Sequence, residues 1–120
     1  MAEHNDLGNL GESIARKHLQ RKGYKLLEAN WRFGKDEIDI IAVDKNQLVI
    51  VEVKTRSNRE LGEPEEAVNK KKQKFLVRAA DVYITENNIE MDCRFDIIAI
   101  IYQNSKAEIN HIVDAFYPTL

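Results

Sequence analysis

Apolar residues recur along this chain with two different periods, and these periods predict its elements. Over residues 6–22 they recur every three or four positions, which predicts a helix that Asp6 caps and Gly23 ends. Residues 24–30, 37–43 and 48–55 are short segments rich in strand-forming side chains, and a turn at 44–47 separates the last two. The first half of the chain is therefore predicted to form a helix and three strands, two of them paired as a β-hairpin.

The second half of the chain predicts one more helix and two more strands. Pro64 suits the first turn of a helix, and apolar residues at helical spacing extend this helix to about Ile84. Residues 94–102 and 109–116 are predicted strands. This order of elements indicates an α/β fold: a mixed central sheet of about five strands flanked by helices, in a single domain over residues 1–120.

Composition narrows the class of protein. Of the 120 residues, 43% are hydrophobic and 32% are charged, which is typical of a globular domain. No apolar run approaches the roughly 20 residues of a membrane span, the N-terminus is acidic rather than signal-like, and the single Cys93 excludes an internal disulfide. We therefore expect a cytoplasmic protein that makes no membrane contact.

The charges are unevenly distributed although the net charge is only −2. Basic residues gather at positions 16–25 and 70–78, and acids gather at positions 36–39 and 60–66. This distribution fits phosphate binding at one face of the molecule. It also fits two ordinary helix surfaces, on which Lys70, Lys71 and Lys74 are solvated or make weak backbone contacts.

Two acids that interrupt apolar strands are the most informative residues in the sequence. Asp39 stands among isoleucines and Glu52 among valines, although an unpaired carboxylate is costly to bury. A hairpin turn centred near Asn46 sets Asp39 and Glu52 close to cross-strand positions, within reach of one shared ion. Lys54 follows Glu52 by two positions, so both side chains project from one face of the strand.

This pattern of residues has a chemical and a structural interpretation. Two carboxylates suit Mg²⁺ or Mn²⁺, which bind oxygen ligands and substrate phosphates. Lys54 could then orient or deprotonate the attacking water, or stabilise the charge of the transition state. In the structural alternative, Glu52 and Lys54 form an ion pair and Asp39 lies at an exposed strand edge.

Several motifs occur together in a set order: Gly8-Asn9-Leu10-Gly11-Glu12, Gly23-Tyr24, Glu37-Ile38-Asp39, Val51-Glu52-Val53-Lys54-Thr55-Arg56, Lys72-Gln73 and Arg94-Phe95-Asp96. This set resembles the YraN-like bacterial family of the PD-(D/E)XK nuclease superfamily and is similar to archaeal Holliday-junction resolvases. It departs from the signature in having Ile38 where a proline is usual, and two extra residues in the loop before Glu37. The resemblance implies a restriction-endonuclease-like fold with Asp39, Glu52 and Lys54 as catalytic residues and Mg²⁺ or Mn²⁺ as cofactor.

Four further residues are candidates for the same site. By analogy with the resolvases, Glu12 completes or orients the metal ligands, and small residues beside it on its helix, such as Gly8 and Ala15, would let that helix approach the sheet. Lys72 falls within the apolar arc of the second helix, so it either contacts a substrate phosphate or extends its ammonium from the edge of the core. Gln73 and Arg56 are weaker candidates for nucleic-acid contact.

Two functions follow from these residues. The first is a Mg²⁺-dependent endonuclease that acts on DNA, with branched or junction DNA in repair or recombination as one specific form. The second is a nucleic-acid-binding protein that keeps the fold without catalysis. Because the domain is small, a homodimer or another partner is one way to span a duplex. Asp96 is expected to pair with Arg94, and His18 is expected to be a packed residue.

Overall fold

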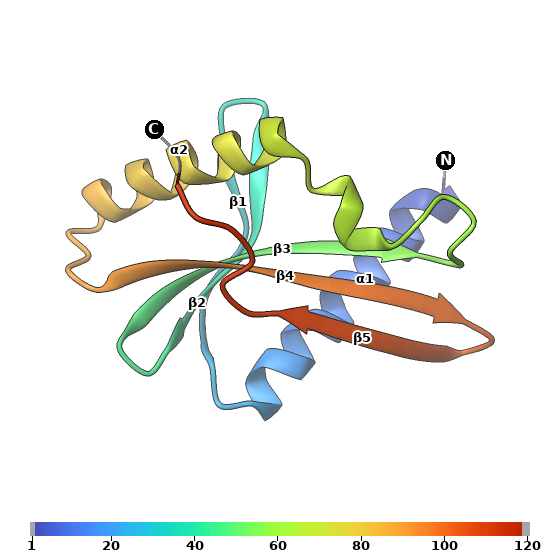
Figure 1. The fold of residues 1–120 in the computed structure, drawn as a ribbon. Coiled ribbons are helices and arrows are strands. Elements are labelled where there is room, and N and C mark those ends of the chain that lie inside the picture. Colours follow the sequence, from blue (N-terminus) through green and yellow to red (C-terminus); the bar gives the residue numbers. More distant parts are fainter. Residues whose placement is uncertain (1, 119–120) are drawn as a thin grey trace.

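A five-stranded mixed sheet with one long helix on each face forms the protein (Figure 1). The computed structural model describes residues 2–118, with side chains from residue 6 onward. The strands lie in the order β1-β2-β3-β4-β5, and all neighbours are antiparallel except β3 and β4, which are parallel. The predicted α/β fold with a mixed sheet of about five strands and flanking helices is confirmed.

Helix α1 spans Ala2–Arg21 and packs Ala15 and Leu19 against the sheet. It begins earlier than predicted, so Asp6 lies within the helix and does not cap it. Its end is the one predicted: Gly23 has φ +90°, and the Tyr24 amide donates to the Leu19 carbonyl at 3.0 Å. A left-handed residue at this point is typical of a helix C-terminus.

Strands β1 (Lys25–Phe33), β2 (Asp36–Asp44) and β3 (Gln47–Arg56) form two successive antiparallel hairpins. The β2–β3 hairpin was predicted and is confirmed, with Asp44 opposite Gln47 at its turn. At the other end, the last paired residues of β2 and β3 are Ile40 and Val51. Beyond this pair β3 follows β4, whereas β2 stays with β1 (Figure 1).

The predicted second helix is split in two. A short 3-10 helix, η1, spans Pro64–Ala67, and α2 spans Lys70–Glu86. Asn69 separates them because its extended backbone begins α2 and its side chain accepts a hydrogen bond from the Lys72 amide at 3.0 Å. Pro64 therefore begins η1 rather than the long helix.

Strands β4 (Asp92–Gln103) and β5 (Lys106–Ile112) complete the sheet. The last predicted strand, residues 109–116, is shifted, because β5 ends at Ile112 and the following residues leave the sheet on the side of α2 (Figure 1). There Phe116 stacks on Phe95 with ring centroids 5.1 Å apart, inside the core that α2 covers. Within residues 2–118, neither helix has the length and apolar character needed to cross a membrane.

Candidate metal centre

The candidate site lies where β2 and β3 part. Asp39 comes directly before Ile40 and Glu52 directly after Val51, so continuing the antiparallel register by one residue sets the two acids opposite each other. Asp39 is 9% exposed and Glu52 is 4% exposed. The main chain holds Asp39 in place, because its Oδ2 accepts a hydrogen bond from the Val53 amide at 2.8 Å. The predicted closeness of these two acids is therefore present in the fold.

Glu52 has the more unusual environment of the two acids. Its Oε1 atom is buried and has no hydrogen-bond partner, and its Oε2 lies 3.7 Å from Lys72 Nζ. Burial raises the pKa of Glu52 to about 8, and the adjacent Asp39 carboxylate acts in the same direction. A buried acid without a partner normally binds a proton or a cation. The raised pKa of Glu52 therefore favours its protonated form at neutral pH, although Lys72 acts in the opposite direction.

Asp39 shares this environment to a lesser degree. Burial raises its pKa to about 6, although the hydrogen bond from the Val53 amide acts in the opposite direction. The negative charge of Glu12 raises the pKa further. Two buried carboxylates repel each other, and a divalent cation bound between them would relieve this repulsion.

Glu12 reaches the site from α1 and meets a residue that was not predicted. Carboxylate oxygens of Glu12, Glu37 and Asp39 all lie within 4.8 Å of one another. Asn30 joins the two glutamates, since its side-chain amide donates to Glu12 at 2.9 Å and to Glu37 at 3.0 Å. Asn30 itself has φ +53°, a left-handed conformation in which asparagine is one of the favoured residues.

Gly11 explains how α1 brings Glu12 so close to the sheet. A Cβ atom at Gly11 would lie 1.8 Å from Thr55 Oγ1, so only glycine permits this contact between α1 and β3. Ala15, one turn along, is fully buried. A Cβ atom at Gly8, in contrast, would meet nothing within 4 Å. The prediction that small residues let α1 approach the sheet therefore holds at Ala15. At Gly8 the space around the residue does not require a small side chain.

Lys72 lies between the site and the β1–β2 turn. Its Nζ donates to both Asp36 carboxylate oxygens, at 3.1 and 3.2 Å, and the side chain is 21% exposed. Burial lowers the pKa of Lys72, but Glu52 and Asp36 outweigh this effect and the net shift is upward. Asp36 begins β2 and is one of the two extra residues before Glu37. A phosphate contact by Lys72 stays a prediction.

Lys54 is half-buried on β3, two residues after Glu52. Its positive charge lowers the pKa of Glu52, by less than that of Lys72 does. Among the residues described, the ion pair of Glu52 is with Lys72 and none within 4.0 Å joins Glu52 to Lys54. The structural alternative of a Glu52–Lys54 ion pair is therefore not what the fold contains.

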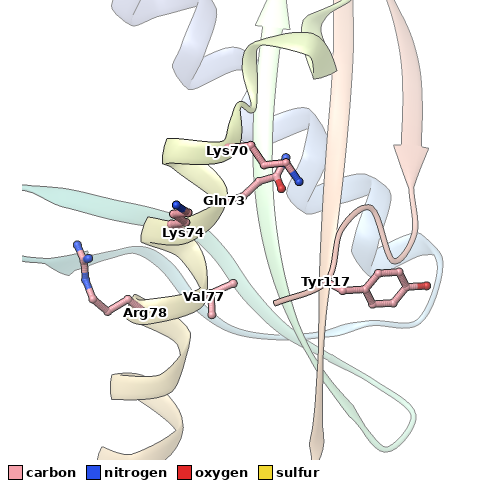
Figure 2. A pocket seen from close by; sticks show the side chains of 6 residues that line it. All are labelled: Lys70, Gln73, Lys74, Val77, Arg78 and Tyr117. Atoms are coloured by element: carbon pink, nitrogen blue, oxygen red, sulfur yellow. The ribbon is translucent and has the colours of Figure 1, made fainter. Parts of the chain in front are cut away.

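The other two candidates lie apart from the carboxylates. The Gln73 side chain donates to the Val68 carbonyl at 3.1 Å, which ties the start of α2 to η1. It also lines a cavity of about 240 Å³ on α2 (Figure 2). Arg56 ends β3 and lines a different cavity of about 440 Å³ that includes Lys54 and Leu7. Neither has a contact with Asp39 or Glu52 among the described hydrogen bonds and ion pairs.

A second cluster of buried polar side chains lies on β4 and β5, and its hydrogen bonds join distant parts of the fold. Arg94 makes two hydrogen bonds to Asp96, at 2.9 and 3.0 Å, as expected from the sequence. His111 Nε2 lies 2.8 Å from Asp96, and His111 Nδ1 lies 3.2 Å from His18 Nε2. Sequence patterns did not indicate this histidine pair, because the two residues are 93 positions apart.

The fold and site together define a class: an α/β protein with carboxylates gathered where two strands of its mixed sheet part. Comparison with known proteins is more specific. Residues 11–100 match the model of the uncharacterised protein family UPF0102, and the chain belongs to this family. The resemblance to the YraN-like family is thereby confirmed.

The relatives extend along the whole chain. A UPF0102 protein of Bacteroides thetaiotaomicron is 52% identical over 120 residues, which cover 100% of this chain and 99% of the relative. A UPF0102 protein of Flavobacterium psychrophilum is 50% identical over 117 residues, with 98% of both chains covered. One from Flavobacterium johnsoniae is 47% identical over 121 residues, again with 98% of both chains covered. These names assign no activity.

Proposed function

We propose that this protein is a Mg²⁺- or Mn²⁺-dependent endonuclease that hydrolyses phosphodiester bonds in DNA. The observation that carries the proposal is the buried Glu52 Oε1 without a partner, beside Asp39. A proton satisfies such an atom in the absence of metal, and a divalent cation satisfies it better once Asp39 is ionised. The resemblance of the motifs to PD-(D/E)XK nucleases supports the choice of reaction.

The donor atoms fit the proposed cation. Glu12, Glu37 and Asp39, which have oxygens within 4.8 Å of one another, offer only carboxylate oxygens, and so does Glu52 next to Asp39. Carboxylate oxygens are the ligands that Mg²⁺ and Mn²⁺ prefer. When bound, the cation supplies positive charge to offset the charge that develops on the phosphate, and it lowers the pKa of a water molecule. Asp39 and Glu52 are the principal ligands, and Glu12 and Glu37 complete or orient the set.

The protein's own residues position the other partners of the reaction. Hydrolysis adds the hydroxyl of water to phosphorus and a proton to the leaving oxygen, so groups that donate hydrogen bonds to the phosphate lower the barrier. Lys54 is placed to do so because it projects from the same strand as Glu52. Lys72 keeps a second ammonium next to Glu52 while Asp36 restrains it. Asn30 fixes the orientation of Glu12 and Glu37.

Cleavage of a panel of DNA substrates tests the proposal. Labelled single strands, duplexes, flaps and four-way junctions are incubated with Mg²⁺ or Mn²⁺, and products are resolved on denaturing gels. We expect cleavage of at least one substrate, reduced about 100-fold or more in Asp39→Asn, because one ligand is neutralised. Asparagine keeps an oxygen acceptor for the Val53 amide, so this variant is a suitable control for folding and for contaminating nucleases.

The substrate panel also separates the two functions that the sequence suggests. Preferential cleavage of flaps or junctions would place the activity in DNA repair or recombination. If wild type and Asp39→Asn give equal cleavage on every substrate with either metal, the endonuclease proposal fails. Retained DNA binding in that case would favour the non-catalytic nucleic-acid-binding protein.

A further inference from the structure

The outward face of the first half of α2 carries only positive charge. Lys70, Lys71, Lys74 and Arg78 are all exposed, and none of their side chains takes part in an ion pair or hydrogen bond within the described part of the chain. The sequence from Lys70 to Ala80 contains no acid. We call these four residues the basic face of α2. The first acid on the helix is Asp81, three positions after Arg78, so the charges of Lys70, Lys71 and Lys74 are not compensated by acids close by on α2.

The lysines of the basic face lie at the unfavourable end of the helix. The N-terminal turn of a helix carries a partial positive charge, so cations there cost a few tenths of a kcal/mol each. The first turn of α2 contains lysines and no acid, whereas α1 has His18 and Arg21 in its last turn, where the dipole favours them. The dipole therefore favours His18 and Arg21 of α1 and disfavours Lys70 and Lys71 of α2.

Two cavities lie against the basic face. One, of about 240 Å³, is lined by Lys70, Gln73, Lys74, Val77, Arg78 and Tyr117. Figure 2 shows Lys70 and Gln73 extending toward one side of α2 and Arg78 toward the other, with the Tyr117 ring turned away from the helix. The other cavity, of about 440 Å³, includes three of the four cations together with Lys72, Phe75 and Asp36. Lys72, which lines this second cavity, also lies 3.7 Å from Glu52 of the candidate metal centre.

We propose that the basic face of α2 binds the sugar-phosphate backbone of DNA beside the bond to be cleaved. The proposal rests on the function proposed above and adds the path of the substrate: along α2, through the cavity that holds Lys72, to Glu52 and Asp39. From Lys70 to Arg78 the helix rises about 12 Å. Measured along the axis of a duplex, each strand carries one phosphate about every 3.4 Å, so a helix of this length parallel to that axis spans about three of them.

The surroundings of the basic face favour nucleic acid over an acidic membrane. A helix that lies on a lipid surface needs exposed apolar side chains next to its cations. The exposed large hydrophobic residues of the described chain are Leu10, Leu61, Val113 and Tyr117; none of them is on α2, and only Tyr117 lines a cavity beside the basic face. The cations instead flank concave surfaces, which suit a strand of nucleic acid.

Two charge-matched triple variants test the proposal. One is K71Q/K74Q/R78Q on the basic face, and the other is K17Q/R21Q/K22Q at the end of α1, which packs on the opposite face of the sheet. Both remove two lysines and one arginine, all from exposed positions. Binding to a labelled single strand, a linear duplex and a four-way junction is measured by fluorescence anisotropy, in EDTA and at several salt concentrations.

We expect the α2 variant to lose about 100-fold in affinity for DNA at about 0.1 M salt. The slope of its plot of log affinity against log salt should become shallower by about 2 to 3 units. Each lost phosphate contact reduces this slope by about 0.7 to 0.9. The α1 variant should stay within about twofold of wild type. Circular dichroism melting confirms that both variants fold. Equal losses in the two variants, or absence of any DNA binding by wild type, would overturn the proposal. So would loss of binding to phosphatidylserine vesicles without an effect on DNA, which would indicate a membrane partner instead.

The same measurements keep the two proposals apart. Binding in EDTA requires no catalysis, so binding that depends on α2 in a protein that cleaves nothing would support the basic face and reject the endonuclease. Cleavage with unchanged affinity and KM in the α2 variant would support the endonuclease and reject the basic face.

Discussion

The raised pKa of Glu52 links the candidate site to the stability of the fold. Its carboxyl group is buried, one of its oxygens has no partner, and burial raises its pKa to about 8. Glutamate in the unfolded chain titrates with a pKa near 4.5. Between these two values the folded protein holds a proton that the unfolded chain has lost. The contribution of protonated Glu52 to stability without metal is therefore fully present below the unfolded pKa and is lost as pH rises through about 8.

The variant Glu52→Gln removes this dependence because glutamine resembles the protonated acid. In EDTA we expect its free energy of unfolding to match wild type within about 1 kcal/mol at about pH 5, and to exceed it by at least about 1 kcal/mol at about pH 9. Urea denaturation at these two pH values and at neutral pH measures both. A loss beyond about 2 kcal/mol at every pH would instead show that Glu52 stabilises the fold through its ion pair with Lys72.

Metal binding and proton release should be coupled at Asp39 and Glu52. A cation binds the ionised carboxylates, so Mg²⁺ affinity should rise as pH increases from about 6 to about 8, following the raised pKa values of the two acids. In wild type the melting temperature should rise with added Mg²⁺, and in Asp39→Asn it should not. The exposed acid Asp81 gives the control: Asp81→Asn should keep the full response. Identical calorimetric titrations of wild type and Asp39→Asn would exclude this site.

Among single residues, those that broke the pattern around them were the ones that sequence reasoning could find. Asp39 and Glu52 were visible because acids are rare within apolar strands, and Lys72 because a lysine is rare within an apolar helical arc. Glu37 was missed because it stands next to Asp36 at the polar start of its strand, where an acid is ordinary. Only the fold brings Glu37 to Glu12, through Asn30 in a left-handed conformation.

The elements follow the hydrophobic pattern, and their ends follow local chemistry. Gly23 ended α1 as predicted because its left-handed backbone suits that position. The break between η1 and α2 was not predicted, since Pro64 and Asn69 are both good helix starts and helical spacing continues across them. The structure uses both, so the basic first turn of α2 begins at Lys70 instead of lying deep within a longer helix.

The contact between α1 and β3 gives a prediction with a natural control. A methyl group at Gly11 would overlap Thr55, whereas one at Gly8 meets nothing within 4 Å. We expect Gly8→Ala to stabilise the protein by about 0.5 to 1 kcal/mol, because alanine is the better helix former. Gly11→Ala should destabilise it by about 1 to 3 kcal/mol and weaken Mg²⁺ binding, because Glu12 moves away from Asp39.

Chemical denaturation and calorimetry distinguish these effects of the two glycines. The double variant Gly11→Ala/Thr55→Ala removes the Thr55 Oγ1 atom that the new methyl group would overlap, and it should recover part of the lost stability. Equal stabilisation by both alanines would mean that α1 is not held against β3 at Gly11, and Glu12 would then lose its argued place in the site.

Over the whole molecule, the sequence predicted local pairing better than distant pairing. The β2–β3 hairpin could be predicted because its strands are neighbours in the chain. The buried polar network of β4 could not, because it joins residues from distant segments: Arg94 contacts Asp44, Gln47 and Tyr24 besides Asp96. Sequence alone predicted only the Arg94–Asp96 pair, whose members are two positions apart on one strand.

Asp96 is the centre of this network, and its removal should affect the entire fold. Its side chain is fully buried and accepts hydrogen bonds from Arg94 and from the Asp114 amide, with His111 at 2.8 Å. Burial raises its pKa, but these partners outweigh burial, so its pKa lies below the usual value of 3.8. Its contribution to stability is thus present above about pH 4 and is lost as pH falls through the lower folded value.

Asp96→Asn should therefore lower the free energy of unfolding by about 3 to 5 kcal/mol at neutral pH, since it leaves the Arg94 guanidinium buried without a counter-charge. The exposed Asp92 begins the same strand, and Asp92→Asn should change stability by less than about 0.5 kcal/mol. The double variant Arg94→Met/Asp96→Leu should recover much of the loss, because apolar side chains can replace a buried ion pair.

Urea denaturation from about pH 3 to about pH 7 measures all four proteins, and wild type should approach Asp96→Asn at the acid end. A difference below about 1 kcal/mol at neutral pH would show that the network does not hold the sheet together.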